Sequence, residues 1–159
     1  MGALLVLGGL ILVFVIILAV VIIPLYLLMA FGLNTMAKNA GLENTWLAFI
    51  PIANLYLMGQ LIKEIKISTY VIPNTEYVLP GVTLVTLLLG RIEVLGGLLC
   101  LCNLLLFLVA YYQLYSLYRP EKAKMYTVFS ILCVTVPFFI FMMRNDAMVV
   151  NLNTQGFGQ

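Results

Sequence analysis

The first 33 residues of the chain, Met1 to Leu33, contain no charged side chain. A helix of thirty residues rises about 45 Å, which exceeds the roughly 30 Å hydrocarbon core of a bilayer. A secretory signal peptide has a basic start, an apolar core of only about 7–15 residues and a cleavage site with small residues. This run lacks the basic start and is about twice as long as the apolar core of a signal peptide. We therefore expect a permanent first membrane span over residues 3–33.

The composition extends this expectation to the whole chain. Of its 159 residues, 64% are hydrophobic and 9% are charged, whereas soluble domains have about 25% charged residues. A net charge of +2 is too small to indicate a nucleic-acid partner. Histidine is absent and the three cysteines lack zinc-site spacing. We expect one all-α integral membrane domain over residues 1–159, without a catalytic, cofactor-binding or metal-binding residue.

Short polar segments divide the apolar part of the chain into four expected transmembrane helices. Residues 90–93, Gly-Arg-Ile-Glu, predict a tight turn between two antiparallel helices. Residues 63–77 predict a loop or irregular structure, because polar side chains and a proline lie among them. A polar tail, 147–159, ends the sequence. The predicted spans are residues 3–33, 78–90, 94–118 and 125–143.

Residues 46–62 predict a different kind of segment. The run has only 17 residues and contains a proline, Asn54 and Gln60, which are costly in contact with lipid. We expect a short interfacial or re-entrant helix, with Trp46 and Tyr56 at the depth of the lipid headgroups. The alternative is an ordinary short span packed inside a bundle.

The basic residues favour one orientation in the membrane. If 46–62 is interfacial and the N-terminus lies outside, six basic residues are cytoplasmic and two, Arg91 and Arg144, are external. If 46–62 spans, the better orientation gives five against three. Positive charge is retained on the cytoplasmic side. The first arrangement is therefore favoured, with the basic turn 119–124 in the cytoplasm and both termini outside.

A group of tyrosines lies at the end of the third expected span, beside the basic turn. Aromatic rings with a polar tip favour the membrane interface, so we expect these side chains to be interface anchors, as Trp46 and Tyr56 are. An aromatic cage for a ligand is the alternative. The anchors expected here are Tyr111, Tyr115 and Tyr118.

Asn103 lies within the same span, where an amide requires a partner on another helix. It is a candidate for helix packing or for pore lining, together with Asn54 and Gln60. The sequence has no Ser-His-Asp set, no phosphate-binding glycine loop and no paired carboxylates within an apolar run. We therefore do not expect an enzyme.

The segment from Ala40-Gly41 through Trp46-Leu-Ala-Phe-Ile-Pro-Ile-Ala-Asn-Leu-Tyr56 carries a resemblance to a known group. It resembles an uncharacterised family of small multi-pass membrane proteins of Gram-positive bacteria, which have A-G followed by W-x-x-x-I-P-I-x-N-x-Y after the first span. The stretches 118–123 and 137–145 resemble the end of such proteins. The resemblance implies a bacterial plasma membrane and this helical layout, and it implies no active site.

Two functions are compatible with these features. The first is a non-enzymatic membrane subunit or scaffold that self-associates or anchors a larger membrane complex. The second is a small oligomeric channel or transporter formed around Asn54, Gln60 and Asn103. The partners expected are the lipid bilayer and either further copies of the chain or another membrane protein.

Overall fold

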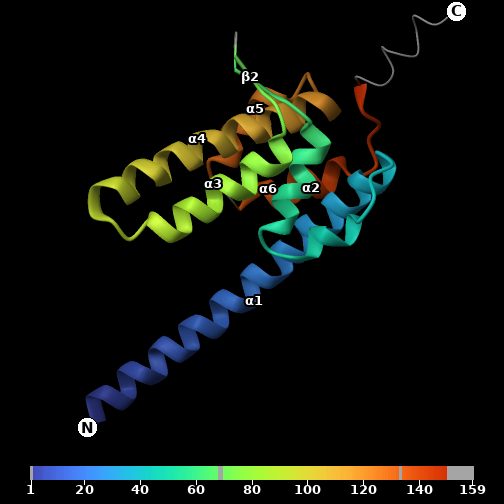
Figure 1. Ribbon diagram of the computed structural model, residues 1–159. Helices are drawn as coiled ribbons and strands as arrows, with labels where there is room; N and C mark the ends of the chain where they lie inside the picture. Colours follow the sequence, from blue (N-terminus) through green and yellow to red (C-terminus); the bar gives the residue numbers. More distant parts are fainter. Residues whose placement is uncertain (1, 68–69, 133, 150–159) are drawn as a thin grey trace, which may run out of the picture.

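The computed structural model describes residues 2–67, 70–132 and 134–149, so most of the predicted tail 147–159 lies outside the described residues. The described chain is predominantly helical (Figure 1), as predicted, with one small β-hairpin. The elements in chain order are α1 (Gly2–Asn39), the 3-10 helix η1 (Thr45–Phe49), α2 (Ala53–Ile62), β1 (Ile65–Ile67), β2 (Tyr70–Ile72), α3 (Thr75–Leu89), α4 (Glu93–Tyr118), α5 (Ala123–Ser130) and α6 (Thr135–Met143).

Helix α1 is longer than the predicted span 3–33 and continues to Asn39. It ends because Gly41 adopts a left-handed conformation with φ 71°. The N–H of Gly41 then donates to the carbonyl of Lys38, and the N–H of Leu42 donates to the carbonyl of Ala37, which is the Schellman pattern of helix termination. The first half of α1 projects away from the other helices (Figure 1).

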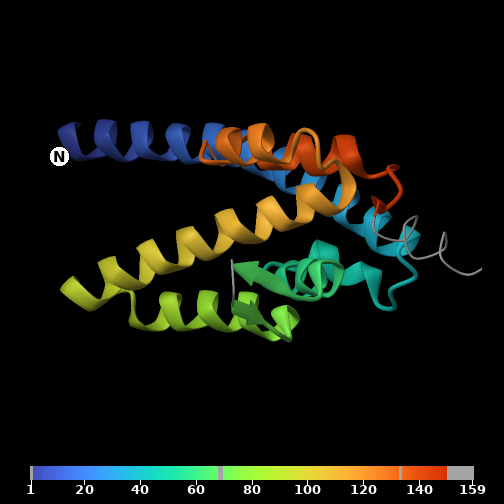
Figure 2. The same cartoon turned by 90° about the horizontal axis from the view of Figure 1, so that it is seen from above.

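Helices α3 and α4 form the antiparallel hairpin expected from the turn at 90–93. Helix α3 begins at Thr75, three residues before the predicted start, and α4 begins at Glu93. The turn and the N-terminus of α1 lie toward the same end of the molecule (Figure 2). The predicted boundaries of this part of the chain were therefore close to the observed ones.

The predicted continuous span 125–143 is wrong. Helix α5 ends at Ser130, and α6 begins at Thr135 and runs back beside it (Figure 2). The rings of Tyr126 and Phe139 stack with centroids 4.3 Å apart, which is the pairing expected of two antiparallel helices. Pro137 lies in the first turn of α6, where a residue without an N–H is tolerated because the first turn has no intrahelical acceptors for its N–H groups.

Residues 46–62 are also broken, into η1 and α2, on either side of Ile50-Pro51-Ile52. The first part contacts the end of α1, and α2 packs along α3. The segment is therefore not one continuous helix of 17 residues.

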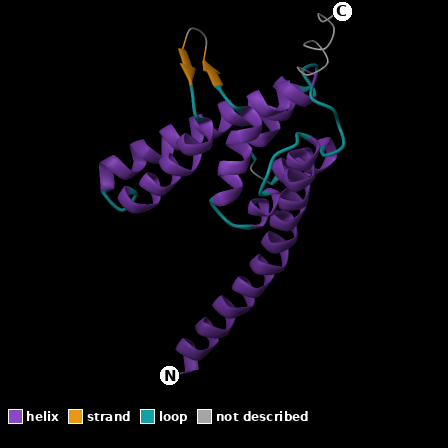
Figure 3. Cartoon of the chain, turned by 45° about the vertical axis from the view of Figure 1, so that its right-hand side comes forward, coloured by secondary structure: helices purple, strands orange, loops and turns teal. Residues whose placement is uncertain are grey.

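Part of the segment 63–77, predicted to be irregular, forms the antiparallel hairpin β1–β2, which projects beside the C-terminal end of α4 (Figure 3). Ile65 pairs with Ile72. The side chain of Ile65 is fully buried, and Ile72 packs against the core. These β-branched residues suit a strand, and their burial attaches the hairpin to the helices.

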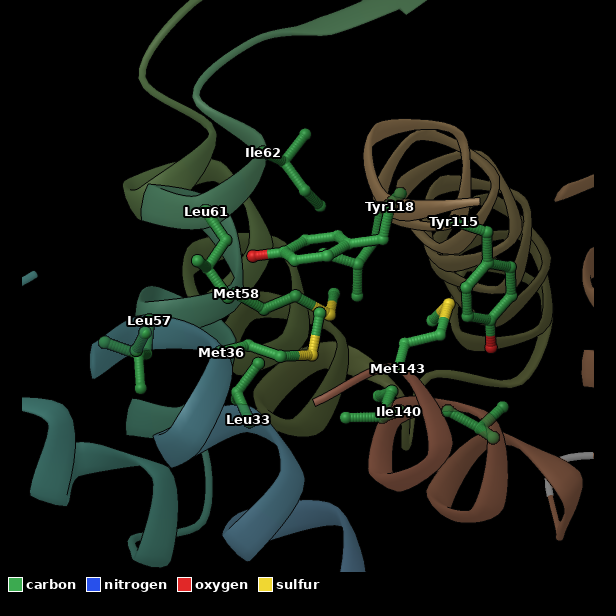
Figure 4. Close-up of a cluster of buried hydrophobic side chains, with 14 of the residues drawn as sticks. Leu33, Met36, Leu57, Met58, Leu61, Ile62, Tyr115, Tyr118, Ile140 and Met143 are labelled. Atoms are coloured by element: carbon green, nitrogen blue, oxygen red, sulfur yellow. The ribbon is translucent and has the colours of Figure 1, made fainter. Parts of the chain in front are cut away.

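The main core lies where the C-terminal ends of four helices meet (Figure 4). Each helix contributes side chains from its last turns, so the four helix ends must converge. The core includes Leu33 and Met36 of α1, Leu57, Met58, Leu61 and Ile62 of α2, Tyr115 and Tyr118 of α4, and Ile140 and Met143 of α6.

Candidate functional site: the convergent helix ends

A basic residue lies at the C-terminal end of each of the four convergent helices. Lys38 is in the last turn of α1, and Lys63, Arg119 and Arg144 directly follow α2, α4 and α6. The C-terminus of a helix carries a partial negative charge, which a cationic side chain stabilises. We call this region of the molecule the basic end. Convergence of four helix C-termini gives a physical reason for the concentration of positive side chains there.

Arg119 and Asp146 form an ion pair at the basic end. Nε of Arg119 lies 2.5 Å from Oδ2 of Asp146, and Nη2 lies 3.2 Å from Oδ1. Both side chains are 29% exposed, and the two parallel contacts make the forked geometry that strengthens an arginine–carboxylate pair. Nη1 of Arg119 also donates to the hydroxyl of Tyr126 at 3.4 Å. The hydrogen bond to Asp146 is the main cause of a raised pKa for Arg119, which therefore stays charged.

A second contact attaches the end of α1 to the end of α6. Nδ2 of Asn39 donates to the carbonyl oxygen of Arg144 at 3.0 Å. The guanidinium of Arg144 lies over the ring of Phe141, 3.7 Å from its centroid. The ends of α1, α4 and α6 are thus joined by direct polar contacts.

These contacts correct one part of the membrane layout expected from the sequence. That layout placed the turn 119–124 and Arg144 on opposite sides of the membrane. Asp146, two residues after Arg144, is paired with Arg119, so the two regions lie at the same end of the molecule. The cause of the error is the break before Pro137, which reverses the chain halfway through the expected span.

Two of the three tyrosines of α4 that were expected to be interface anchors are buried inside the protein. Tyr115 is fully buried and Tyr118 is almost so, so they cannot face lipid headgroups as anchors. Tyr115 lies between α5 and α6, with edge-to-face contacts to Tyr126 and Phe139. Tyr111 is half-buried and stacks on Tyr115.

The hydroxyl of Tyr115 is 2.9 Å from Oγ of Ser130. Oγ of Ser130 in turn donates to the carbonyl oxygen of Tyr126 at 2.8 Å. Since a serine hydroxyl has a single hydrogen, the tyrosine must be the donor of the first bond. Ser130 therefore joins α4 to the last turn of α5 inside the protein.

Replacing Ser130 with alanine is expected to destabilise the protein by about 1–3 kcal/mol, because the buried hydroxyl of Tyr115 loses its acceptor. Thermal unfolding in a mild detergent measures the change. The double variant Y115F/S130A should lose less than S130A, since neither partner is then left unpaired. Ser116, whose hydroxyl bonds the carbonyl of Tyr112 on the exposed side of α4, is the matched control, and S116A should change the unfolding temperature little. Equal losses in S116A and S130A would contradict the assignment.

The three predicted packing or pore residues are not brought together as one set. Asn54 is buried in the first turn of α2. Gln60 donates to the hydroxyl of Tyr56 at 3.1 Å, one turn away on the same helix. Oδ1 of Asn103 is buried without a hydrogen-bond partner among the described residues. Within the same part of the chain, no hydrogen bond joins any two of these three side chains. Their expected roles stay predictions.

The other expected features have the following positions. Trp46 is exposed on η1, and Tyr56 is half-buried with its ring edge-on to Tyr77. Cys100 and Cys102 are exposed on α4 as free thiols. Among the residues that the structure describes, no group of three or more acidic or cysteine side chains is placed to hold a metal ion.

Two helices are long and apolar enough to cross a membrane, α1 over Val6–Asn39 and α4 over Val94–Tyr118. Comparison with protein families, curated proteins and solved structures finds no match to the chain. The resemblance carried by the Trp46–Tyr56 motif therefore stays a prediction.

Proposed function

We propose that this protein is a non-enzymatic integral membrane subunit, which self-associates or anchors a larger complex in a bacterial plasma membrane. The observation that supports the proposal is the exposed first half of α1. All described side chains from Val6 to Leu18 are exposed, and they are apolar around the whole circumference of the helix. A helix with this surface is stable only in lipid or against another apolar helix.

We further propose three crossings, by α1, α3 and α4, in place of the four expected. The pairs η1–α2 and α5–α6 are then re-entrant, because each enters from the basic end and returns to it. Seven basic residues belong to the basic end and its adjoining elements, and only Arg91 lies at the opposite end. Seven against one is a stronger bias than the six against two expected from the sequence, and it favours a cytoplasmic basic end. The seven are Lys38, Lys63, Lys66, Arg119, Lys122, Lys124 and Arg144.

Cysteine labelling in intact cells tests this orientation. In a background with the three natural cysteines replaced by alanine, E121C and A147C should both resist a membrane-impermeant thiol reagent, and I92C should react. Permeabilised cells provide the control, since all three positions are exposed on the protein and should then be labelled. External labelling at Ala147 with protection at Glu121 would instead support a fourth crossing and defeat the re-entrant assignment.

Photo-crosslinking in native membranes tests the subunit function. A photoreactive residue replacing Val13, on the exposed half of α1, should form an adduct with a protein of defined mass. The same residue replacing Leu33, which is fully buried, is the matched control and should form no adduct with another chain. If Val13 and its exposed neighbours form adducts with lipid alone, α1 does not bind a partner and the proposal fails.

A channel or transporter is the competing function, and flux separates the two. Proteoliposomes containing the purified protein should show the same ion and small-solute leakage as empty liposomes. Flux that depends on Asn54 or Asn103 would favour the channel and count against a subunit without transport activity.

A further inference from the structure

A cavity of about 270 Å³ lies between five helices. Its lining comes from α1, from the tips of both re-entrant pairs and from the middle of α4. The lining residues are Met29, Leu55, Leu104, Phe107, Leu108, Tyr111, Ser130, Val136 and Pro137.

The chemistry of this lining suits a hydrocarbon. Seven of the nine lining residues have apolar side chains, and the other two, Ser130 and Tyr111, each carry a hydroxyl. The single hydrogen of Ser130 is already donated to Tyr126, and its oxygen accepts from Tyr115. A buried water needs two to four polar partners, and apolar cavities that lack them stay dry or take apolar ligands.

The depth of the cavity matches the interior of a bilayer, given the membrane placement proposed above. Along α4, Tyr111 is seven residues and Leu104 fourteen residues from Tyr118, which correspond to about 10 and 21 Å at 1.5 Å per residue. With a hydrocarbon core of about 30 Å, the cavity lies near the middle of the membrane. Leu104 is 46% exposed, so part of the lining also meets the surrounding lipid.

The charges above the cavity favour an anionic headgroup. Lys122 and Lys124 are exposed at the start of α5, with one exposed carboxylate, Glu121, beside them. Ser130, which lines the cavity, is eight residues after Lys122, or about 12 Å along α5. A lipid phosphate near the two lysines would place the carbon chain of the same molecule at the level of the cavity.

We infer that the cavity binds one acyl chain of an anionic phospholipid whose headgroup contacts Lys122 and Lys124. The inference rests on the proposed membrane placement and not on the identity of any protein partner.

Native mass spectrometry of the delipidated protein tests the site with two probes. Dioleoylphosphatidylglycerol and dioleoylphosphatidylcholine have the same chains and differ in headgroup charge. The wild-type protein should retain one molecule of the first lipid in preference to the second. L104W fills the cavity and should lower retention at least tenfold, whereas L105W, at a neighbouring position that is 61% exposed and outside the lining, should retain the lipid. K122Q/K124Q should abolish the preference for the anionic lipid.

Three results would overturn the inference: no retained lipid, equal loss in L104W and L105W, or equal retention of both lipids by the wild type. A second measurement does not depend on the folding of any variant. Phosphatidylglycerol with a photoreactive group in its acyl chain should label Leu104, Phe107 or Val136 of the wild type in nanodiscs. If these three residues are labelled no more strongly than the outward-facing Leu101, the site is also refuted. If the protein retains no lipid but Val13 still forms an adduct with another protein, this inference alone is refuted. If the protein retains the lipid but Val13 forms no adduct with another protein, the proposed function alone is refuted.

Discussion

Replacing Gly59 with alanine is expected to destabilise the protein by about 3 kcal/mol, toward the upper end of the usual range for overpacking. Gly59 lies on the face of α2 that meets the start of α3. A Cβ atom there would lie 2.5 Å from the backbone nitrogen of Glu76 and 2.6 Å from the carbonyl oxygen of Thr75. Both obstacles are backbone atoms, so no side-chain rotation relieves the clash, and α2 and α3 must move apart.

The same substitution at Gly81 is the matched control. Gly81 is also helical, on α3, and a Cβ atom there has no heavy atom within 4 Å. Alanine is a better helix former than glycine, so G81A should unfold at the same temperature as the wild type or slightly above it. Thermal unfolding in mild detergent compares the two. A G59A protein as stable as G81A would show that α2 and α3 are not in close contact.

The parts of the fold that could be predicted from the sequence depend on local signals. A long uncharged run predicts an apolar helix, and the glycine-flanked charges at 90–93 predict a turn. Both signals depend on neighbouring residues, and α1, α3 and α4 were found with boundaries that differ from the predicted ones by at most six residues. Gly41 also signals a break, and the helix before it continues to Asn39.

The reversal between α5 and α6 could not be predicted, because hydropathy does not distinguish a reversal from a crossing. Residues 125–143 have the length and composition of a span, and only Pro137 signals a break. A proline can either kink a helix or begin a new one, and the choice depends on contacts made elsewhere. Here the stacking of Tyr126 on Phe139 stabilises the reversed arrangement.

The hairpin β1–β2 was missed for a different reason. The polar residues of 63–77 led to the prediction of a loop. The β-branched and aromatic residues of Ile65-Lys66-Ile67 and Tyr70-Val71-Ile72 are nevertheless typical of strands. At the candidate site, the sequence indicated the basic turn 119–124 but not the ion pair. Arg119 and Asp146 are separated by 27 residues, and their pairing follows from the reversal between α5 and α6.

Reversing the charge of Arg119 tests that reversal most directly. R119D places two carboxylates together in a partly exposed site and removes a forked ion pair. Because a hydrogen bond to a charged group contributes about 1.5–3 kcal/mol, we expect the free energy of unfolding to fall by about 3 kcal/mol. D146R should cost a similar amount, because Arg119 is then opposed by a second cation.

The double variant R119D/D146R restores an ion pair with the charges exchanged, and it should recover at least half of the loss. Residues in direct contact show coupling of this kind, whereas distant residues contribute additively. K122D, at an exposed position in the same turn, is the matched control and should change stability little. If residues 119 and 146 lay on opposite faces of a membrane, about 30 Å apart, the two losses would simply add. Additive losses would therefore contradict the ion pair, the re-entrant α5–α6 pair and the single basic end together, since all three depend on this contact.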